Sequence, residues 1–201
     1  MTDPLPEKQA RTRPASKPRK PRGPKKATAG YLENAALYYL ERFATSSENL
    51  RRVLMRKVIR SAQTHGTDPD EGADMIAALI ARYQSAGLLD DRAYARARAT
   101  TLHRAGNSAR AIRGKLAQKG VAADQITDAL DALEDDDDGD PELRAAVRLA
   151  KKRRLGPFRS PDVRADKRDK DLAALARAGF SYDIARTVIE AETTDELDES
   201  T

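Results

Sequence analysis

The stretch GLLDDRAYARARATTLHRAGNSARAIRGKLAQKGVAADQITDALDAL, residues 87–133, decides how this chain folds. It predicts three short helices joined by turns. In the third helix apolar residues recur at i, i+3, i+4 and i+7, which marks one buried helix face: Ile126, Ala129, Leu130 and Leu133. Gly120 is expected to end the middle helix in the left-handed conformation, with Val121 packing back on Leu116. Asp90 or Asp91 is expected to cap the first helix.

The preceding residues, 31–86, repeat this arrangement. A helical apolar stripe that includes Phe43 is followed by Thr45 and Glu48, which match a capping box and predict the start of a second helix, with a boundary uncertain by one residue. A third apolar stripe ends at Gly87. We therefore expect a first unit of three helices in front of the central one.

A third unit follows, because Asp140-Pro141-Glu142 is a strong helix start. Windows 116–130 and 175–189 share four identities, including the glycine stop, at an offset of 59. This similarity favours a true internal repeat. The fold class is thus an all-α, elongated and curved tandem array of three three-helix units with disordered N- and C-terminal tails. The expected segments are a disordered basic arm 1–30, units 31–86, 87–134 and 141–192, an acidic linker 135–140 and an acidic tail 193–201.

The formal net charge of +5 conceals a strong segregation. Residues 1–30 carry +7, residues 134–142 carry −7 and residues 190–201 carry −6, which leaves +11 on the helical body. A basic body beside acidic segments indicates a polyanionic partner, either nucleic acid or an assembly on it.

Composition excludes several other classes of protein. The chain has no cysteine, so we expect no disulfide or thiolate chemistry. No apolar run approaches the roughly 20 residues needed to cross a bilayer, and no signal-peptide core follows the N-terminus, so a soluble cytoplasmic protein that binds no membrane is expected. No catalytic or nucleotide-binding motif is present, which argues against an enzyme. His65 and His103 follow no metal spacing and are both expected at the surface, so we expect neither a cofactor nor a metal.

Basic residues on the outer helix faces are the candidate binding site. The alternative for each is a solvated helix face, but the charge segregation favours binding for most of them. The candidates are Arg51, Arg52, Arg56, Arg60, Arg104, Arg110, Arg113, Lys115, Lys119, Arg144, Arg148, Lys151 and Lys152. The last four share one face of a helix by their i, i+4, i+7, i+8 spacing.

Most aromatic side chains are expected in the cores rather than at a binding surface. Tyr38 and Tyr182 remain open, because stacking on a nucleic-acid base requires an exposed ring beside positive charge. The side chains assigned to inner stripes are Tyr31, Tyr39, Phe43, Tyr83, Tyr94 and Phe180.

Over residues 31–190 the chain resembles the RecX family, regulators of the RecA recombinase. The motifs that carry the resemblance are LRRVLMRKV at 50–58, GLLDD at 87–91 followed by Tyr94, RAIRGKLAQKGV at 110–121 and RAGFSYDIA at 177–185. The chain departs from the family at Ala178, where a basic residue is common, and at Gly114, which interrupts a helix that the family usually keeps intact. Gly114 should cost about 1 kcal/mol relative to alanine unless close helix packing uses it.

The resemblance implies a non-enzymatic modulator. The sequence shows no heptad pattern for dimerisation, so we expect a monomer. Family members bind in the groove of the RecA filament on single-stranded DNA and reduce its ATP hydrolysis, strand exchange and co-protease activity, which implies roles in recombination, DNA repair and the SOS response. Contacts to single-stranded DNA itself would be weak and sensitive to salt. The rival interpretation is a stand-alone basic DNA-binding protein, such as a helix-turn-helix transcriptional regulator that inserts helix 109–119 into the major groove.

Overall fold

The computed structural model describes residues 23–135 and 139–199. Most of the predicted basic arm and half of the predicted acidic linker lie outside these residues.

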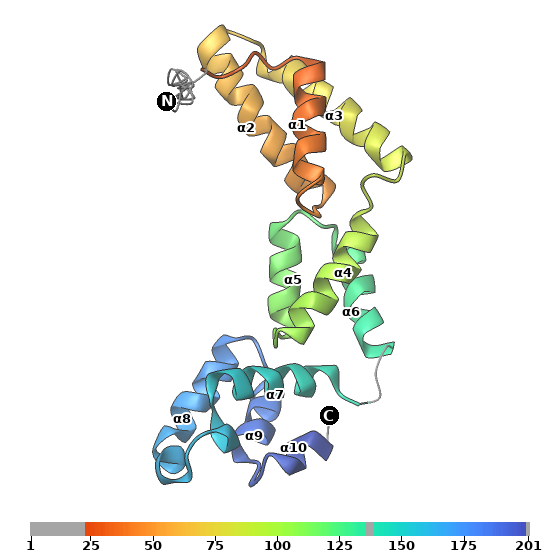
Figure 1. Ribbon diagram of the computed structural model, residues 1–201. Coiled ribbons are helices and arrows are strands. Elements are labelled where there is room, and N and C mark those ends of the chain that lie inside the picture. The colour runs from red at the N-terminus through yellow and green to blue at the C-terminus, as the bar shows by residue number, and fades with distance from the viewer. Residues whose placement is uncertain (1–22, 136–138, 200–201) are drawn as a thin grey trace, which may run out of the picture.

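The described residues form helices and contain no strand. The first unit consists of α1 (Ala29–Leu40), α2 (Ser47–His65) and α3 (Pro69–Ser85), and the second of α4 (Asp91–Arg104), α5 (Ala109–Gln118) and α6 (Ala123–Asp135). The third consists of α7 (Pro141–Arg153), a 3₁₀ turn η1 (Gly156–Phe158), α8 (Pro161–Arg177), α9 (Tyr182–Glu190) and α10 (Asp195–Glu199). The units follow one another along an elongated array (Figure 1), so the predicted all-helical tandem fold is confirmed.

Each unit has a hydrophobic core of its own. Leu50, Leu54 and Ile76 are fully buried in the first unit, and Ile112 and Leu116 in the second. The core of the third unit includes the fully buried Leu175 and Val188. These thin, separate cores are typical of repeat proteins, in which each unit contacts only its neighbours.

The local signals that end and begin helices act largely as expected. Gly120 has a φ of +76°, and the amide of Val121 donates to the carbonyl of Leu116 at 3.2 Å. Asp90 caps α4 by accepting a hydrogen bond from the amide of Ala93 at 2.9 Å. The predicted capping box is displaced by one residue, because Ser46 rather than Thr45 caps α2.

The first and third units extend beyond their predicted limits. Ala27 is buried, and its amide donates to Ser61 Oγ at 2.9 Å, so the first unit begins before residue 31. At the other end Leu197, within the predicted acidic tail, is 2% exposed in the core of the third unit. A single leucine among acids gives no helical stripe, which is why the sequence did not indicate α10.

Two of the predictions of burial that are wrong concern residues at which units meet. Phe43 is 54% exposed instead of buried, because α1 ends before it. His103 is buried instead of exposed, and its Nε2 lies 2.7 Å from the carbonyl oxygen of Pro141 in the next unit. His65 is exposed as expected.

In the part of the chain that the structure describes, no helix has both the length and the apolar character needed to span a membrane.

Candidate functional site

The second helices of the three units, α2, α5 and α8, succeed one another along one side of the array (Figure 1). Ser46, the cap of α2, donates from its hydroxyl to the carbonyl of Lys119 at the end of α5. Ser108, the cap of α5, donates in the same way to the carbonyl of Ala178 at the end of α8, at 2.7 Å. We call these contacts the first joint, between units one and two, and the second joint, between units two and three.

A carboxylate reinforces each joint. Asp91 Oδ1 accepts from the amide of Ser47 at 2.7 Å in the first joint, and Glu142 Oε2 accepts from the amide of Ala109 at 2.9 Å in the second. Both amides belong to the first turn of a helix, where backbone donors lack partners within the helix. Burial raises the pKa of Glu142, and the hydrogen bond from Ala109 opposes this rise. Each joint therefore fixes the direction of one unit relative to the next.

Two glycines allow the units to approach closely at the joints. A Cβ added at Gly120 would lie 2.3 Å from Glu48 Cγ and 2.5 Å from Glu48 Cβ. A Cβ added at Gly179 would lie 2.6 Å from Ser108 Oγ. Gly120 and Gly179 are the glycines that the sequence repeat aligned, so the repeat marks the joints as well as the helix ends.

The predicted basic residues of α2 are exposed, but they differ in their partners. Arg51 and Arg52 both pair with Glu48, at 2.6 and 2.9 Å, and Arg52 also donates to the carbonyl of Gln118 at 2.8 Å. Arg52 therefore contributes to the first joint as well as carrying charge, whereas Arg51 pairs within α2. Two further predicted cations of α2 make no ion pair within the described residues and are available to a partner: Arg56 and Arg60.

The predicted cations of the second unit are also exposed. Lys115 donates to Asn107 Oδ1, and Arg113 donates to Thr127 Oγ1 at 3.3 Å, so both keep their charge on the surface. Arg104, Arg110 and Lys119 have no acidic partner within the described residues. The basic outer face predicted for α5 is therefore present.

The basic face predicted for α7 is present only in its second half. Arg148, Lys151 and Lys152 are exposed, but Arg144 is 6% exposed and does not belong to an outer face. The first half of α7 lies between the second unit and the rest of the third, so residues 143–147 are buried on every side. Helix periodicity could not predict this, because a regular spacing does not indicate how many neighbours surround a helix.

The structure adds a cation that the sequence did not indicate. Arg177, at the end of α8, lines a hollow of about 350 Å³ together with Arg110 at the second joint. The two residues are 67 positions apart and come together only because α5 and α8 meet end to end. Exposed guanidinium groups such as these are suited to pairing with phosphate or carboxylate groups. Across residues 23–135 and 139–199, no group of three or more His, Cys, Asp or Glu residues could hold a metal ion.

Comparisons with known proteins agree with this architecture. Residues 90–130 match the family model described as RecX, second three-helix domain. Regulatory protein RecX of Myxococcus xanthus (strain DK1622) is 44% identical over 180 residues, covering 87% of this chain and 92% of the relative. Regulatory protein RecX of Agrobacterium fabrum (strain C58 / ATCC 33970) is 34% identical over 169 residues, covering 84% and 86% respectively. The crystal structure of RecX from Lactobacillus salivarius superimposes with a TM-score of 0.59 at 27% identity, covering 85% of this chain and 97% of that one. The chain belongs to the RecX family of regulatory proteins.

Proposed function

We propose that this protein is a cytoplasmic, monomeric, non-enzymatic regulator that binds RecA filaments on single-stranded DNA and mainly inhibits them. It would thereby modulate recombination, DNA repair and the SOS response. The observation that carries the proposal is the jointed array, which presents exposed cations on three successive units. Such a shape suits a long groove that displays phosphates and acidic side chains, because many weak contacts on linked units add up to avidity.

The geometry of α5 disfavours the rival helix-turn-helix function. A recognition helix inserts its N-terminal residues into the major groove. In this protein the N-terminus of α5 is covered by the second joint, where Ser108 contacts the end of α8. The C-terminus of α5 is covered by the first joint. The N-terminal end of α5 could reach the base edges of duplex DNA only if the second joint opened.

ATP hydrolysis by RecA on single-stranded DNA tests the proposal. The protein is added well below the concentration of its binding sites on the strand. Inhibition under these conditions is expected, since a ligand that prefers an inactive filament state shifts the population towards that state. Inhibition only when the protein saturates naked DNA would favour the rival function, and the absence of any inhibition would refute the proposal.

A pair of variants separates specific binding from the effect of net charge. Arg56→Gln with Arg60→Gln removes two exposed cations that lack ion pairs in the described structure, and it should weaken inhibition and its dependence on salt. Arg92→Gln with Arg186→Gln makes the same change in charge at arginines already close to acids, at 3.8 Å from Asp128 and 3.5 Å from Glu190 respectively. This control should inhibit nearly as well as the wild type. Equal losses in both double variants would show that only net charge matters.

A further inference from the structure

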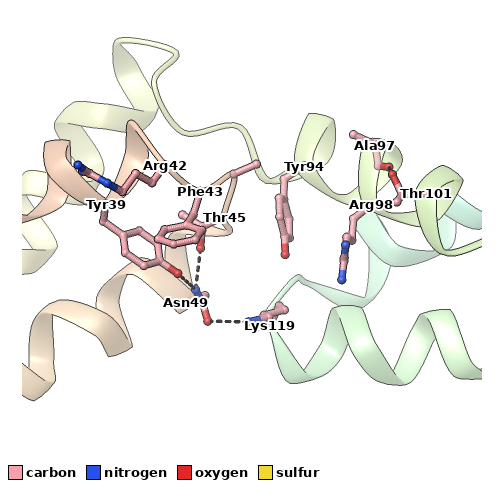
Figure 2. Close-up of a pocket in the computed structure, with 11 residues that line it drawn as sticks. Tyr39, Arg42, Phe43, Thr45, Asn49, Tyr94, Ala97, Arg98, Thr101 and Lys119 are labelled. Carbon is pink, nitrogen blue, oxygen red and sulfur yellow. Dashed lines mark hydrogen bonds between the residues drawn. The ribbon is translucent and has the colours of Figure 1, made fainter.

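A cleft of about 470 Å³ opens between the first and second units, beside the first joint (Figure 2). Tyr39 and Phe43 form one wall, with ring centroids 5.0 Å apart and the rings inclined at 41°. Tyr94, from α4, stands on the other side of the cleft (Figure 2). Three aromatic rings from two units thus lie around one open space, and Phe43 is 54% exposed there.

Positive charge lies beside these rings. Arg98 follows Tyr94 by one turn of α4, lines the cleft and makes no ion pair or side-chain hydrogen bond within the described residues. Lys119 lines the cleft from the end of α5, with its Nζ 3.4 Å from Asn49 Oδ1. None of the lining residues is acidic. The cleft therefore offers both a cationic site and aromatic surfaces to a ligand.

Polar groups lie among the rings of the cleft. Asn49 donates from its side-chain amide to Thr45 Oγ1 at 2.7 Å and to Tyr39 Oη at 3.2 Å. An aliphatic anchor from a protein partner would require an enclosed apolar pocket. A planar base with an attached phosphate instead matches exposed rings, neighbouring cations and polar groups, the combination found in proteins that bind single-stranded nucleic acid.

We propose that this cleft binds one nucleotide of single-stranded DNA. The base stacks on Phe43, opposite Tyr94, and Arg98 and Lys119 contact its phosphate. A volume of about 470 Å³ falls within the usual range for a small-molecule site. The choice of single-stranded DNA as the source of the nucleotide rests on the proposed function, but binding to naked DNA does not require a filament.

Fluorescence anisotropy of the full-length protein with two labelled oligonucleotides tests the base contact. One is oligothymidylate, and the other has the same length and charge but abasic sites. The wild type should bind the thymidylate more tightly. Phe43→Ala should weaken binding of the thymidylate about 5-fold or more, the lower limit for losing a base–aromatic stack, and should leave the abasic strand unaffected. Phe43→Trp should retain the preference. Tyr182→Ala removes a ring that is 61% exposed in the third unit and should change neither affinity.

Arg98→Gln tests the phosphate contact separately. It should weaken binding of both oligonucleotides equally. It should also reduce the steepness with which the logarithm of the binding constant falls against the logarithm of the salt concentration, by about 0.7, the value for one phosphate of a single strand. Arg96→Gln makes the same change in charge at an exposed residue on another face of α4 and should keep the wild-type slope.

Three results would overturn the proposal. The first is equal affinity of the wild type for the two strands, and the second is an equal loss on both strands with Phe43→Ala. The third is a loss of RecA inhibition with Phe43→Ala while oligonucleotide binding stays intact, which would assign the cleft to a protein segment. Because the binding assay contains no recombinase, its outcome is distinguishable from a failure of the proposed function.

Discussion

Substituting Gly120 by alanine should open the first joint, and substituting Gly66 provides a matched control. Both glycines have positive φ, +76° and +65° respectively, so both substitutions force alanine into the left-handed region. A Cβ at Gly66 meets nothing within 4 Å, whereas one at Gly120 would lie 2.5 Å from Glu48 Cβ. Because Glu48 Cβ is fixed to the backbone of α2, rotation of the glutamate side chain cannot relieve the clash, and α2 must shift.

The two costs can be separated. The left-handed conformation costs alanine about 1–2 kcal/mol at either position. Shifting α2 also breaks the hydrogen bond from Ser46 to Lys119, worth about 1 kcal/mol, and the charged one from Arg52 to Gln118, worth about 1.5–3 kcal/mol. We therefore expect Gly66→Ala to lower the free energy of unfolding by about 1–2 kcal/mol and Gly120→Ala by about 3.5–6 kcal/mol.

Urea denaturation followed by circular dichroism at 222 nm measures both free energies. Small-angle X-ray scattering should in addition show a changed radius of gyration for Gly120→Ala only, because that variant loses the fixed direction between units. If the two variants lost the same stability and kept the same dimensions, the first joint would not be a structural element of the array.

Three further substitutions test single contacts. Gly114 lies on an exposed face of α5 with nothing within 4 Å of a Cβ, so Gly114→Ala should raise the free energy of unfolding by about 1 kcal/mol in urea denaturation. Asp171 is 3% exposed and binds Arg159 through both carboxylate oxygens, at 2.8 and 3.0 Å. Asp171→Asn should therefore lower the midpoint of thermal unfolding, at a cost of about 3 kcal/mol, and an unchanged midpoint would contradict this. The pKa of Glu142 is higher in the folded protein than in the unfolded chain. Ionisation of Glu142 therefore lowers the free energy of unfolding at a pH above the folded pKa, and this loss of stability disappears once the pH falls below the unfolded pKa. Glu142→Gln should accordingly be more stable than the wild type at pH 7, and this advantage should vanish below about pH 4 in parallel denaturation curves.

The sequence predicted those features that depend on neighbouring residues. Gly120 ends its helix and Val121 packs on Leu116 because a left-handed stop is a property of five or six consecutive residues. The three cores were predictable for the same reason, since each helix shows its buried stripe within three turns. The exposed cations of α2 and α5 were predictable as well, because they occupy the helix positions that lie outside the buried stripes.

The features that the sequence did not predict depend on contacts between units. His103 is buried by Pro141, 38 residues later, and Arg144 by helices on both sides of α7. Phe43 remains exposed because α1 ends before the stripe that contains it is complete. The cleft beside it combines residues of α1, α2 and α4 with Lys119 at the end of α5, and no local pattern identifies residues that meet only across a joint.

The serines that form the joints recur in the sequence, but their spacing differs from the offset of 59 residues at which the internal repeat was found. Ser46 and Ser108 are 62 positions apart, and their partners Lys119 and Ala178 are 59 apart. Each contact uses the side chain of a serine and the backbone carbonyl of its partner. Because a backbone carbonyl is present in every residue, the partner position can be lysine in one joint and alanine in the other. Ser160 begins α8 as the corresponding serines begin α2 and α5, yet it makes no side-chain capping bond in the described structure. Ser46 and Ser108 each accept a capping bond from their own helix and also donate to a carbonyl of the next unit, so a serine at the start of a second helix marks a joint only where the end of another helix lies against it.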